Sequence, residues 1–195
     1  MAAKLNKIVF DVETQKDFSE VGGRDKNHLL KVSVVCAYSY PEDKYYNFTE
    51  DQMYRLGEMF SEADQIIGFN IKHFDFEVVK PYFSFDPQEL PYLDIMQEVE
   101  KLIGHRVKLD NLAQSTLGVG KNGDGLEAIR LFRQGRIDEL KKYCQNDVKI
   151  TKELYDYVKT YGKLLYKDYF ETKEVKLTFP EPAARKPIVR QTSLF

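Results

Sequence analysis

The stretch at residues 8–14 constrains this chain most, because a short apolar run ends there in two carboxylates separated by one residue. If the stretch is a strand, Asp11 and Glu13 project from one face and Val12 from the other. Like charges at the end of a buried strand are costly unless a cation lies between them, and Mg²⁺ prefers carboxylate oxygens. The stretch alone predicts either a metal site or a strand that ends in a solvated acidic loop.

Length and charge limit the class of protein. The 195 residues suit one domain with a sizeable core, and 43% hydrophobic with 31% charged residues is ordinary for a globular protein. The formal net charge of −2 is too low for a protein that coats a duplex by charge, so we expect any nucleic-acid contact to be local. Cys36 and Cys144 predict neither a disulfide framework nor a cysteine-type zinc site. Without a signal-like or membrane-spanning run, the sequence predicts a soluble cytoplasmic protein.

Periodicity and turn residues predict an α/β fold. Strands are expected at residues 8–14, 29–40, 45–48 and 66–69, with a short one ending at Leu93. Helices are expected after the cap Thr49, at 73–82, from the cap Asp94 to Ile103, at 109–117 and at 137–165. This order indicates a mixed five-stranded sheet flanked by helices.

The remaining stretches are expected to be irregular. Residues 15–28 form a polar loop near the carboxylates, and the glycine-rich loop at 117–125 lacks the spacing of a phosphate-binding P-loop. Residues 175–179 alternate like a last strand or an extended arm. The proline-rich stretch after them divides the chain into a domain at 1–179 and an extended or disordered tail at 180–195.

Two further acidic elements lie far from the first. Asn70, which tolerates left-handed geometry, follows the fourth predicted strand, and Asp75 falls in the first turn of a helix, where the dipole favours a carboxylate. Asp75 could therefore be only a helix-start acid. Tyr143 and Asp147 share one face of the last helix and could be a surface pair. The apolar face of that helix, however, should pack on the sheet and bring Asp147 towards the first strand.

Three segments together, 10–14, 70–75 and 143–147, resemble the three exonuclease motifs of the DEDD superfamily. Their order and spacing resemble the proofreading domain of family B DNA polymerases and its stand-alone bacterial and phage relatives, over about residues 5 to 165. The third motif has the tyrosine (DEDDy) form, because Lys142 stands where the histidine branch has its histidine. The resemblance implies a ribonuclease H-like three-layer fold.

The resemblance also implies a site with two divalent ions, Mg²⁺ or Mn²⁺. Asp11, Glu13 and Asp147 would hold one ion, and Asp11 would bridge to the second. Asp75 would complete the acidic site through water, and Tyr143 would orient the attacking water. Two such ions stabilise both the attacking and the leaving oxygen of an in-line phosphoryl displacement.

Substrate contacts follow less directly. Asn70 and Phe74 match family positions that help to hold the strand end, although Phe74 could equally be a core residue. The three histidines share no close spacing and are expected to be structural or peripheral. A phosphate-binding rim could draw on Lys101, Arg106, Lys108, Arg130, Arg133 and Arg136, although surface solvation explains most such residues.

The segment 191–195 resembles the pentapeptide that binds the bacterial sliding clamp, with a departure at Thr192. Gln191, Leu194 and Phe195 would contact the clamp, and a mobile linker would raise the effective concentration at DNA. The alternative is a frayed terminus that happens to be apolar.

The sequence thus predicts a metal-dependent 3′→5′ exonuclease that acts on single-stranded or frayed DNA ends and releases nucleoside 5′-monophosphates. The chain leaves no room for a polymerase module. A 3′→5′ exoribonuclease on the same scaffold, a clamp-tethered nucleic-acid-binding module without turnover, and an internally cutting nuclease remain as alternatives. The complete acid set argues against a module without turnover.

Overall fold

The computed structural model describes residues 5–120 and 125–182 and contains a mixed five-stranded sheet of order β3-β2-β1-β4-β5. The strands are β1 (Lys7–Thr14), β2 (Val32–Ser39), β3 (Lys44–Thr49), β4 (Gln65–Gly68) and β5 (Tyr92–Asp94). Strands β1, β2 and β3 form an antiparallel meander, and β4 and β5 add to it in parallel. The predicted fold class is confirmed.

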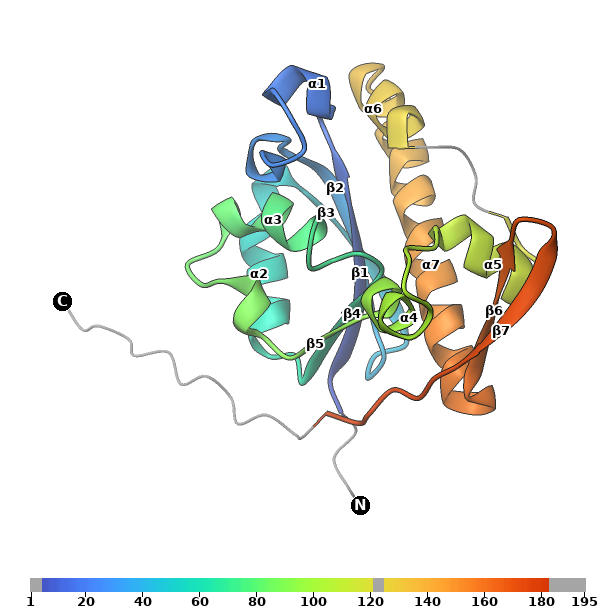
Figure 1. The fold of residues 1–195 in the computed structure, drawn as a ribbon. Coiled ribbons are helices and arrows are strands. Elements are labelled where there is room, and N and C mark those ends of the chain that lie inside the picture. The colour runs from blue at the N-terminus through green and yellow to red at the C-terminus, as the bar shows by residue number, and fades with distance from the viewer. Residues whose placement is uncertain (1–4, 121–124, 183–195) are drawn as a thin grey trace.

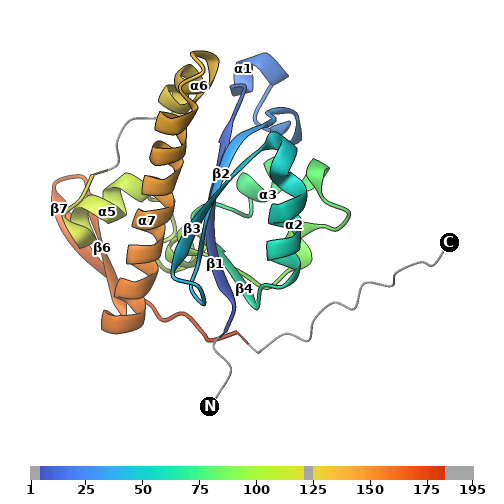
Figure 2. The same ribbon diagram turned by 180° about the vertical axis from the view of Figure 1, so that it is seen from behind.

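Helices cover both faces of this sheet, so the domain has three layers (Figures 1 and 2). The helices are α1 (Phe18–Val21), α2 (Met53–Ser61), α3 (Asp75–Val79), α4 (Ile95–Ile103), α5 (Leu109–Leu117), α6 (Gly125–Arg133) and α7 (Ile137–Tyr161). Helices α2 and α3 pack on one face, and α7 crosses the other with α5 beside it. A two-stranded sheet, β6 (Lys163–Asp168) and β7 (Glu171–Lys176), lies outside α5 and α7.

Alternation along β1 divides the core into two clusters. Val9 belongs to the cluster under α7, whereas Phe10 packs in the cluster under α2 and α3. The Phe10 ring lies 4.8 Å from that of Phe60 and 5.6 Å from that of Phe76, measured between centroids. Because side chains alternate, this arrangement directs Asp11 towards α7.

Several predicted boundaries were wrong. The last helix ends at Tyr161 rather than at residue 165, because Gly162 adopts a left-handed φ of 68° and its N–H bonds the Val158 carbonyl at 2.8 Å. The residues after it form β6, which sequence periodicity had merged with the helix. Helix α6 was not predicted, and residues 15–28 include the one-turn helix α1, capped by Asp17 and Glu20. The last strand comes earlier than expected, at 171–176.

The chain after β7 packs against the domain. The Phe179 ring stacks on that of Tyr155 at 5.5 Å, and Glu181 pairs with Lys7 at 2.5 Å and with Lys159 at 2.7 Å. The predicted clamp-binding residues lie outside the described residues. Cys36 and Cys144 are buried free thiols. None of the helices in the described parts of the chain combines the length and apolar character that a bilayer crossing requires.

Candidate metal centre

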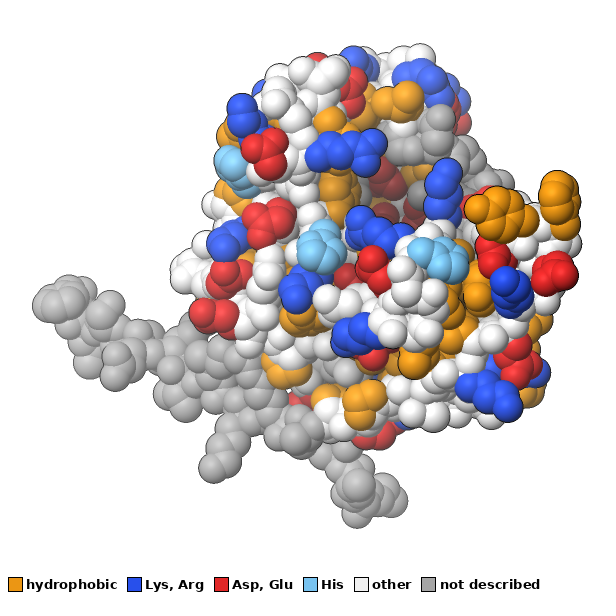
Figure 3. Space-filling model, viewed as in Figure 1, with side chains coloured by type: hydrophobic (Ala, Val, Ile, Leu, Met, Phe, Trp, Pro, Cys, Tyr) orange, Lys and Arg blue, Asp and Glu red, His pale blue; other side chains and the backbone are white. Residues whose placement is uncertain are grey.

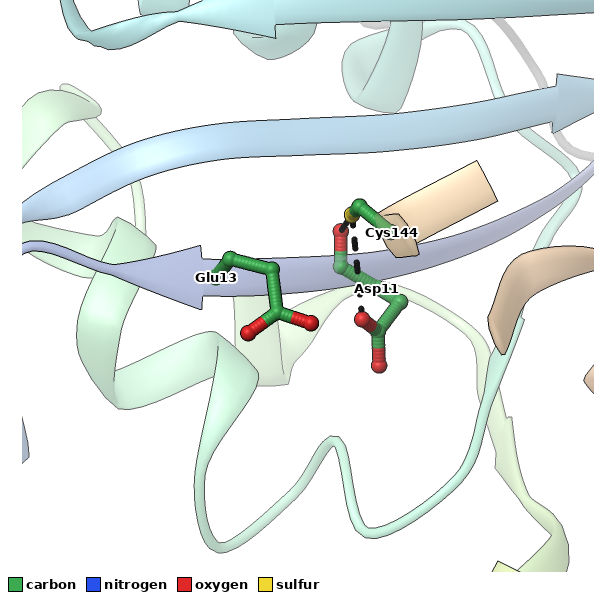
Figure 4. A group of neighbouring side chains, drawn as sticks. All are labelled: Asp11, Glu13 and Cys144. Atoms are coloured by element: carbon green, nitrogen blue, oxygen red, sulfur yellow. Dashed lines mark hydrogen bonds between the residues drawn. The ribbon is translucent and has the colours of Figure 1, made fainter. Parts of the chain in front are cut away.

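Acidic side chains lie in a hollow near the middle of one face of the molecule (Figure 3). Asp11 and Glu13 extend from the end of β1, and Cys144 of α7 meets them there (Figure 4). One ligand atom from each of these three residues lies within 4.8 Å of the other two. Within residues 5–120 and 125–182, this is the one group of three acidic, histidine or cysteine side chains close enough to share an ion.

The pairing of β1 with β2 changes register at the end of β1, next to the two carboxylates. The pairing with β2 runs regularly to Glu13 opposite Val34 and then moves to Thr14 opposite Val32, so Ser33 is the extra residue. Bulges of this kind increase the local twist and re-aim side chains, and they are common beside active sites. Here the shift follows directly after the second carboxylate, so the bulge ends the regular ladder at the acidic group.

Asp75, the first residue of α3, contacts the other edge of β1, opposite the edge that pairs with β2. Strand β4 pairs with β1 only as far as Val9, which leaves that edge of β1 without a neighbouring strand further on. The Asp75 carboxylate takes the vacant place and accepts the Val12 N–H at 3.1 Å. Asp75 is only 2% exposed, and burial, followed by the nearby charge of Asp11, raises its pKa. Asp75 therefore starts α3 and also binds β1, the strand that carries Asp11 and Glu13.

The loop that carries Asp75 is held by Asp94, which is 1% exposed. The Asp94 carboxylate caps α4 by accepting the Gln97 N–H at 3.3 Å, as predicted. It also accepts the N–H groups of Asn70 at 2.8 Å and Lys72 at 3.1 Å. Asn70 adopts a left-handed φ of 64° in this turn, as its residue type suggested. No local sequence pattern predicts these two extra bonds, because their donors lie more than twenty residues upstream.

The Asp94→Ala variant is expected to lose about 1–3 kcal/mol in free energy of unfolding, since it leaves three partly buried N–H groups without their acceptor. Amide exchange of Asn70 and Lys72 should accelerate with it. The matched control is Asp86→Ala, because Asp86 caps a short 3₁₀ helix on the surface through the Gln88 N–H. Unchanged exchange at both amides in Asp94→Ala would contradict this role.

Cys144 is a partner of the acidic group that the sequence analysis missed. Its thiol donates to the Asp11 carbonyl, with sulfur and oxygen 3.4 Å apart, and lies 3.7 Å from Asp11 Oδ2. Burial, and then the charges of Asp11 and Glu13, raise the pKa of this thiol. In the metal-free protein the thiol is therefore protonated, and it donates a hydrogen bond to Asp11. Nothing in its local sequence separates it from an ordinary buried cysteine.

Tyr143 and Asp147 lie on the buried side of α7, with Asp147 only 2% exposed. They are one helical turn apart and flank Cys144, which contacts β1. Burial excludes the reading of a surface pair. Asp75 and Asp147 are not among the ligand atoms within 4.8 Å of one another, so the tight group is formed by β1 and Cys144.

The two predicted substrate residues lie around the loop after β4. Asn70 Oδ1 accepts a hydrogen bond from the Arg106 guanidinium. Phe74 is half-buried, packs against the cluster under α2 and α3, and meets the Phe18 ring edge-on at 6.1 Å between centroids. The Phe18 ring also contacts Arg24, whose guanidinium carbon lies 5.2 Å from the ring centroid. Phe74 therefore combines a core contact with partial exposure.

Six basic residues were considered for a phosphate-binding rim, and five of them form ion pairs with nearby surface glutamates. The pairs are Lys101–Glu98, Arg106–Glu100, Arg130–Glu127, Arg133–Glu20 and Arg136–Glu139. Exposed pairs of this kind contribute little to stability and are typical of a solvated surface. Arg106 stands apart because it also reaches Asn70. His28, His73 and His105 are exposed, which agrees with a peripheral place.

The donor set suits a hard cation. Two carboxylates from the end of β1 offer the oxygen ligands that Mg²⁺ and Mn²⁺ prefer, and in the metal-free protein Cys144 contributes a protonated thiol beside them. Asp75 adds a buried carboxyl group, whose pKa is raised first by burial and then by the negative charge of Asp11. A divalent cation would neutralise that charge, so the residues fit such an ion.

Comparisons with known proteins identify the family and the fold. A family model of the RNase H superfamily matches residues 8–159. No curated protein is similar enough to count as a relative. Among solved structures, the family B DNA polymerase from the hyperthermophilic archaeon Pyrobaculum calidifontis matches with a TM-score of 0.58 and 17% identity. The match covers 80% of this chain but only 24% of the polymerase, and at this identity it shows the fold alone. With a family model that covers most of its length, this chain belongs to the RNase H superfamily.

Proposed function

We propose that this protein is a divalent-metal-dependent 3′→5′ exonuclease that hydrolyses phosphodiester bonds at the 3′ ends of single-stranded or frayed DNA. The observation that carries the proposal is the approach of buried Asp75 to the end of β1, where Asp11 and Glu13 lie, through its hydrogen bond from the Val12 N–H. Membership of the RNase H superfamily supports a nuclease.

In this proposal, Asp11, Glu13 and Asp147 would hold one divalent ion, and Asp11 would also help to hold a second. When bound, such ions polarise the phosphoryl group and stabilise the charge of the leaving oxygen. The Cys144 thiol fixes the Asp11 side chain, since it bonds both the carbonyl and the carboxylate of that residue. Asp75 completes the acidic site while it holds the Val12 amide.

The remaining residues position water and the strand end. Tyr143, on the buried face of α7, orients the attacking water by its hydroxyl. Asn70 contacts the terminal nucleotide, and the half-buried Phe74 offers its edge to the last base, since stacking tolerates any sequence. Water adds to phosphorus as the bond to the 3′ oxygen breaks, so the products are a nucleoside 5′-monophosphate and a shortened strand with a 3′-hydroxyl.

A digest of 5′-labelled single-stranded DNA with Mg²⁺ or Mn²⁺ tests the proposal. We expect a ladder that shortens progressively from the 3′ end, and an intact circular single strand under the same conditions. Cleavage of the circle would indicate the internally cutting nuclease instead. Parallel digestion of the same sequence as RNA tests the exoribonuclease alternative, which predicts faster loss of RNA than of DNA.

The proposal includes a tether to a sliding clamp through Gln191, Leu194 and Phe195, which lie outside the described residues. Replacing Leu194 and Phe195 together by alanine should abolish clamp binding and leave hydrolysis of free oligonucleotides unchanged. Unaltered clamp binding would remove this part of the proposal. A protein that binds clamp and DNA but does not hydrolyse either nucleic acid would instead fit the alternative of a binding module without turnover.

A further inference from the structure

The turn between β6 and β7 presents two neighbouring aromatic side chains to solvent. Tyr169 is 89% exposed and Phe170 is 97% exposed. Figure 3 shows hydrophobic side chains that project over this hairpin, on the same face as the acidic hollow. Large aromatic side chains contribute to stability by burial, so this pair adds almost nothing to the core.

Local backbone geometry does not explain the pair either. Asp168 pairs with Glu171, so Tyr169 and Phe170 are the two central residues of a tight hairpin turn. Tyr169 has a φ of 52°, at a position where such turns favour glycine or asparagine and where a bulky residue is strained. Strained residues of this kind concentrate at binding and catalytic sites. The turn is therefore built at some cost to stability.

The hairpin that carries the turn is firmly attached to the domain. The Asn111 side chain of α5 bonds both the N–H and the carbonyl of Lys167, at 2.7 and 2.8 Å. The Thr116 hydroxyl does the same for Leu165, at 2.9 and 3.0 Å. Inner side chains of the hairpin such as Leu164 and Val175 belong to the core cluster under α7. The two aromatic rings thus stand on a fixed support.

A basic loop connects this support to the candidate metal centre. Arg106 donates to Asn70 beside the acidic site, and the neighbouring His105 ring meets the Tyr166 ring of β6 at 6.0 Å. Arg106 and Lys108 are exposed. Figure 3 shows basic and histidine side chains on the surface between the hollow and the hairpin. Proteins that bind single-stranded nucleic acid combine basic side chains, which contact the phosphates, with exposed aromatic rings, on which the bases stack. Residues 104–108 and the hairpin turn show this combination.

We propose that Tyr169 and Phe170 form a stacking anchor for the single-stranded part of the substrate, several nucleotides away from the 3′ end of the nucleic acid that is held at β1. The strand would run from Asn70 along residues 104–108 to the hairpin. This inference rests on the proposed function for the identity of the ligand. The anchor selects single-stranded over duplex substrate, because paired and stacked bases do not expose a face to the rings, and it does not select sequence.

Binding without hydrolysis tests the anchor. The fluorescence anisotropy of a labelled oligothymidylate of about 15 nucleotides is measured with wild-type protein in EDTA. The Tyr169→Ala/Phe170→Ala variant should bind it about tenfold or more weakly, as expected for the loss of one stacked base. Tyr54→Ala is the matched control, because Tyr54 is 66% exposed on α2, across the sheet, and its affinity should match wild type. Equal affinity of the double variant and wild type would overturn the anchor.

A second variant separates binding from structure. Tyr169→Gly removes the strain at positive φ and should raise the thermal midpoint by about 2–4 °C, while it lowers oligonucleotide affinity. A lowered midpoint with unchanged affinity would assign Tyr169 a structural role and overturn the anchor. Because these measurements are made without metal, they do not depend on turnover. Oligonucleotide binding that depends on the anchor, without any digestion, would remove the proposed exonuclease but leave the anchor in place. Wild-type protein that fails to bind single strands but self-associates through the hairpin would refute the anchor.

Discussion

Asp11→Asn is expected to lower metal-dependent hydrolysis by about 10³-fold or more with the fold intact. Asn keeps the shape of Asp11 but removes the charge that would hold both ions, and metal ions supply several kcal/mol of transition-state stabilisation, with each 1.36 kcal/mol worth a factor of ten. Initial rates on single-stranded DNA at saturating Mn²⁺ measure the loss. Asp51→Asn is the control, since Asp51 is exposed in the turn before α2.

The same variant should change how the protein responds to metal. An ion that binds only the folded state raises the thermal midpoint, by an amount set by its concentration relative to Kd. Mn²⁺ should therefore stabilise wild type and Asp51→Asn but not Asp11→Asn. Equal stabilisation of all three proteins, or wild-type hydrolysis by Asp11→Asn, would contradict a metal site at this strand end.

The second large effect concerns Asp75, for which the sequence allowed a purely structural reading. Asp75→Asn keeps an oxygen that can accept the Val12 N–H but removes the charge beside Asp11. Because burial and Asp11 raise the pKa of Asp75, removing its ionisable group should leave the metal-free protein as stable as wild type or more so. Hydrolysis should nevertheless fall by about 10²-fold or more.

Asp75→Ala separates the two roles of this residue. It leaves the buried Val12 N–H without an acceptor, which should cost about 1–3 kcal/mol in free energy of unfolding, measured in urea. A helix-start acid with no other role predicts the reverse pattern, in which Asn and Ala variants both hydrolyse DNA at nearly the wild-type rate. That outcome would remove Asp75 from the site.

Local patterns were sufficient for the framework of the site. The alternation around Asp11 and Glu13 predicted a strand with both carboxylates on one side, and the residue type of Asn70 predicted its left-handed turn. The apolar face of the last helix predicted that this helix packs on the sheet, and it does, with Asp147 buried. These features follow from the period of a strand or a helix, which adjacent residues determine.

The features that sequence reading missed depend on distant partners. Asp94 reaches Asn70, Cys144 reaches Asp11, and Asp75 reaches Val12, all across gaps that no local pattern records. The hairpin was missed for another reason. Leucines after Gly162 continued the helical spacing, and periodicity outweighed the glycine that ends the helix.

Hydrolysis in oxygen-18 water shows which bond the enzyme breaks and whether water is the attacking group. Wild-type protein, single-stranded DNA and Mn²⁺ are incubated briefly, and the released nucleotides are analysed by mass spectrometry. We expect nucleoside 5′-monophosphates with one heavy oxygen on phosphorus, released from the 3′ end, and no such products with Asp11→Asn or with EDTA. Products that carry 3′-phosphates, or unlabelled 5′-monophosphates, or equal release without metal, would contradict it.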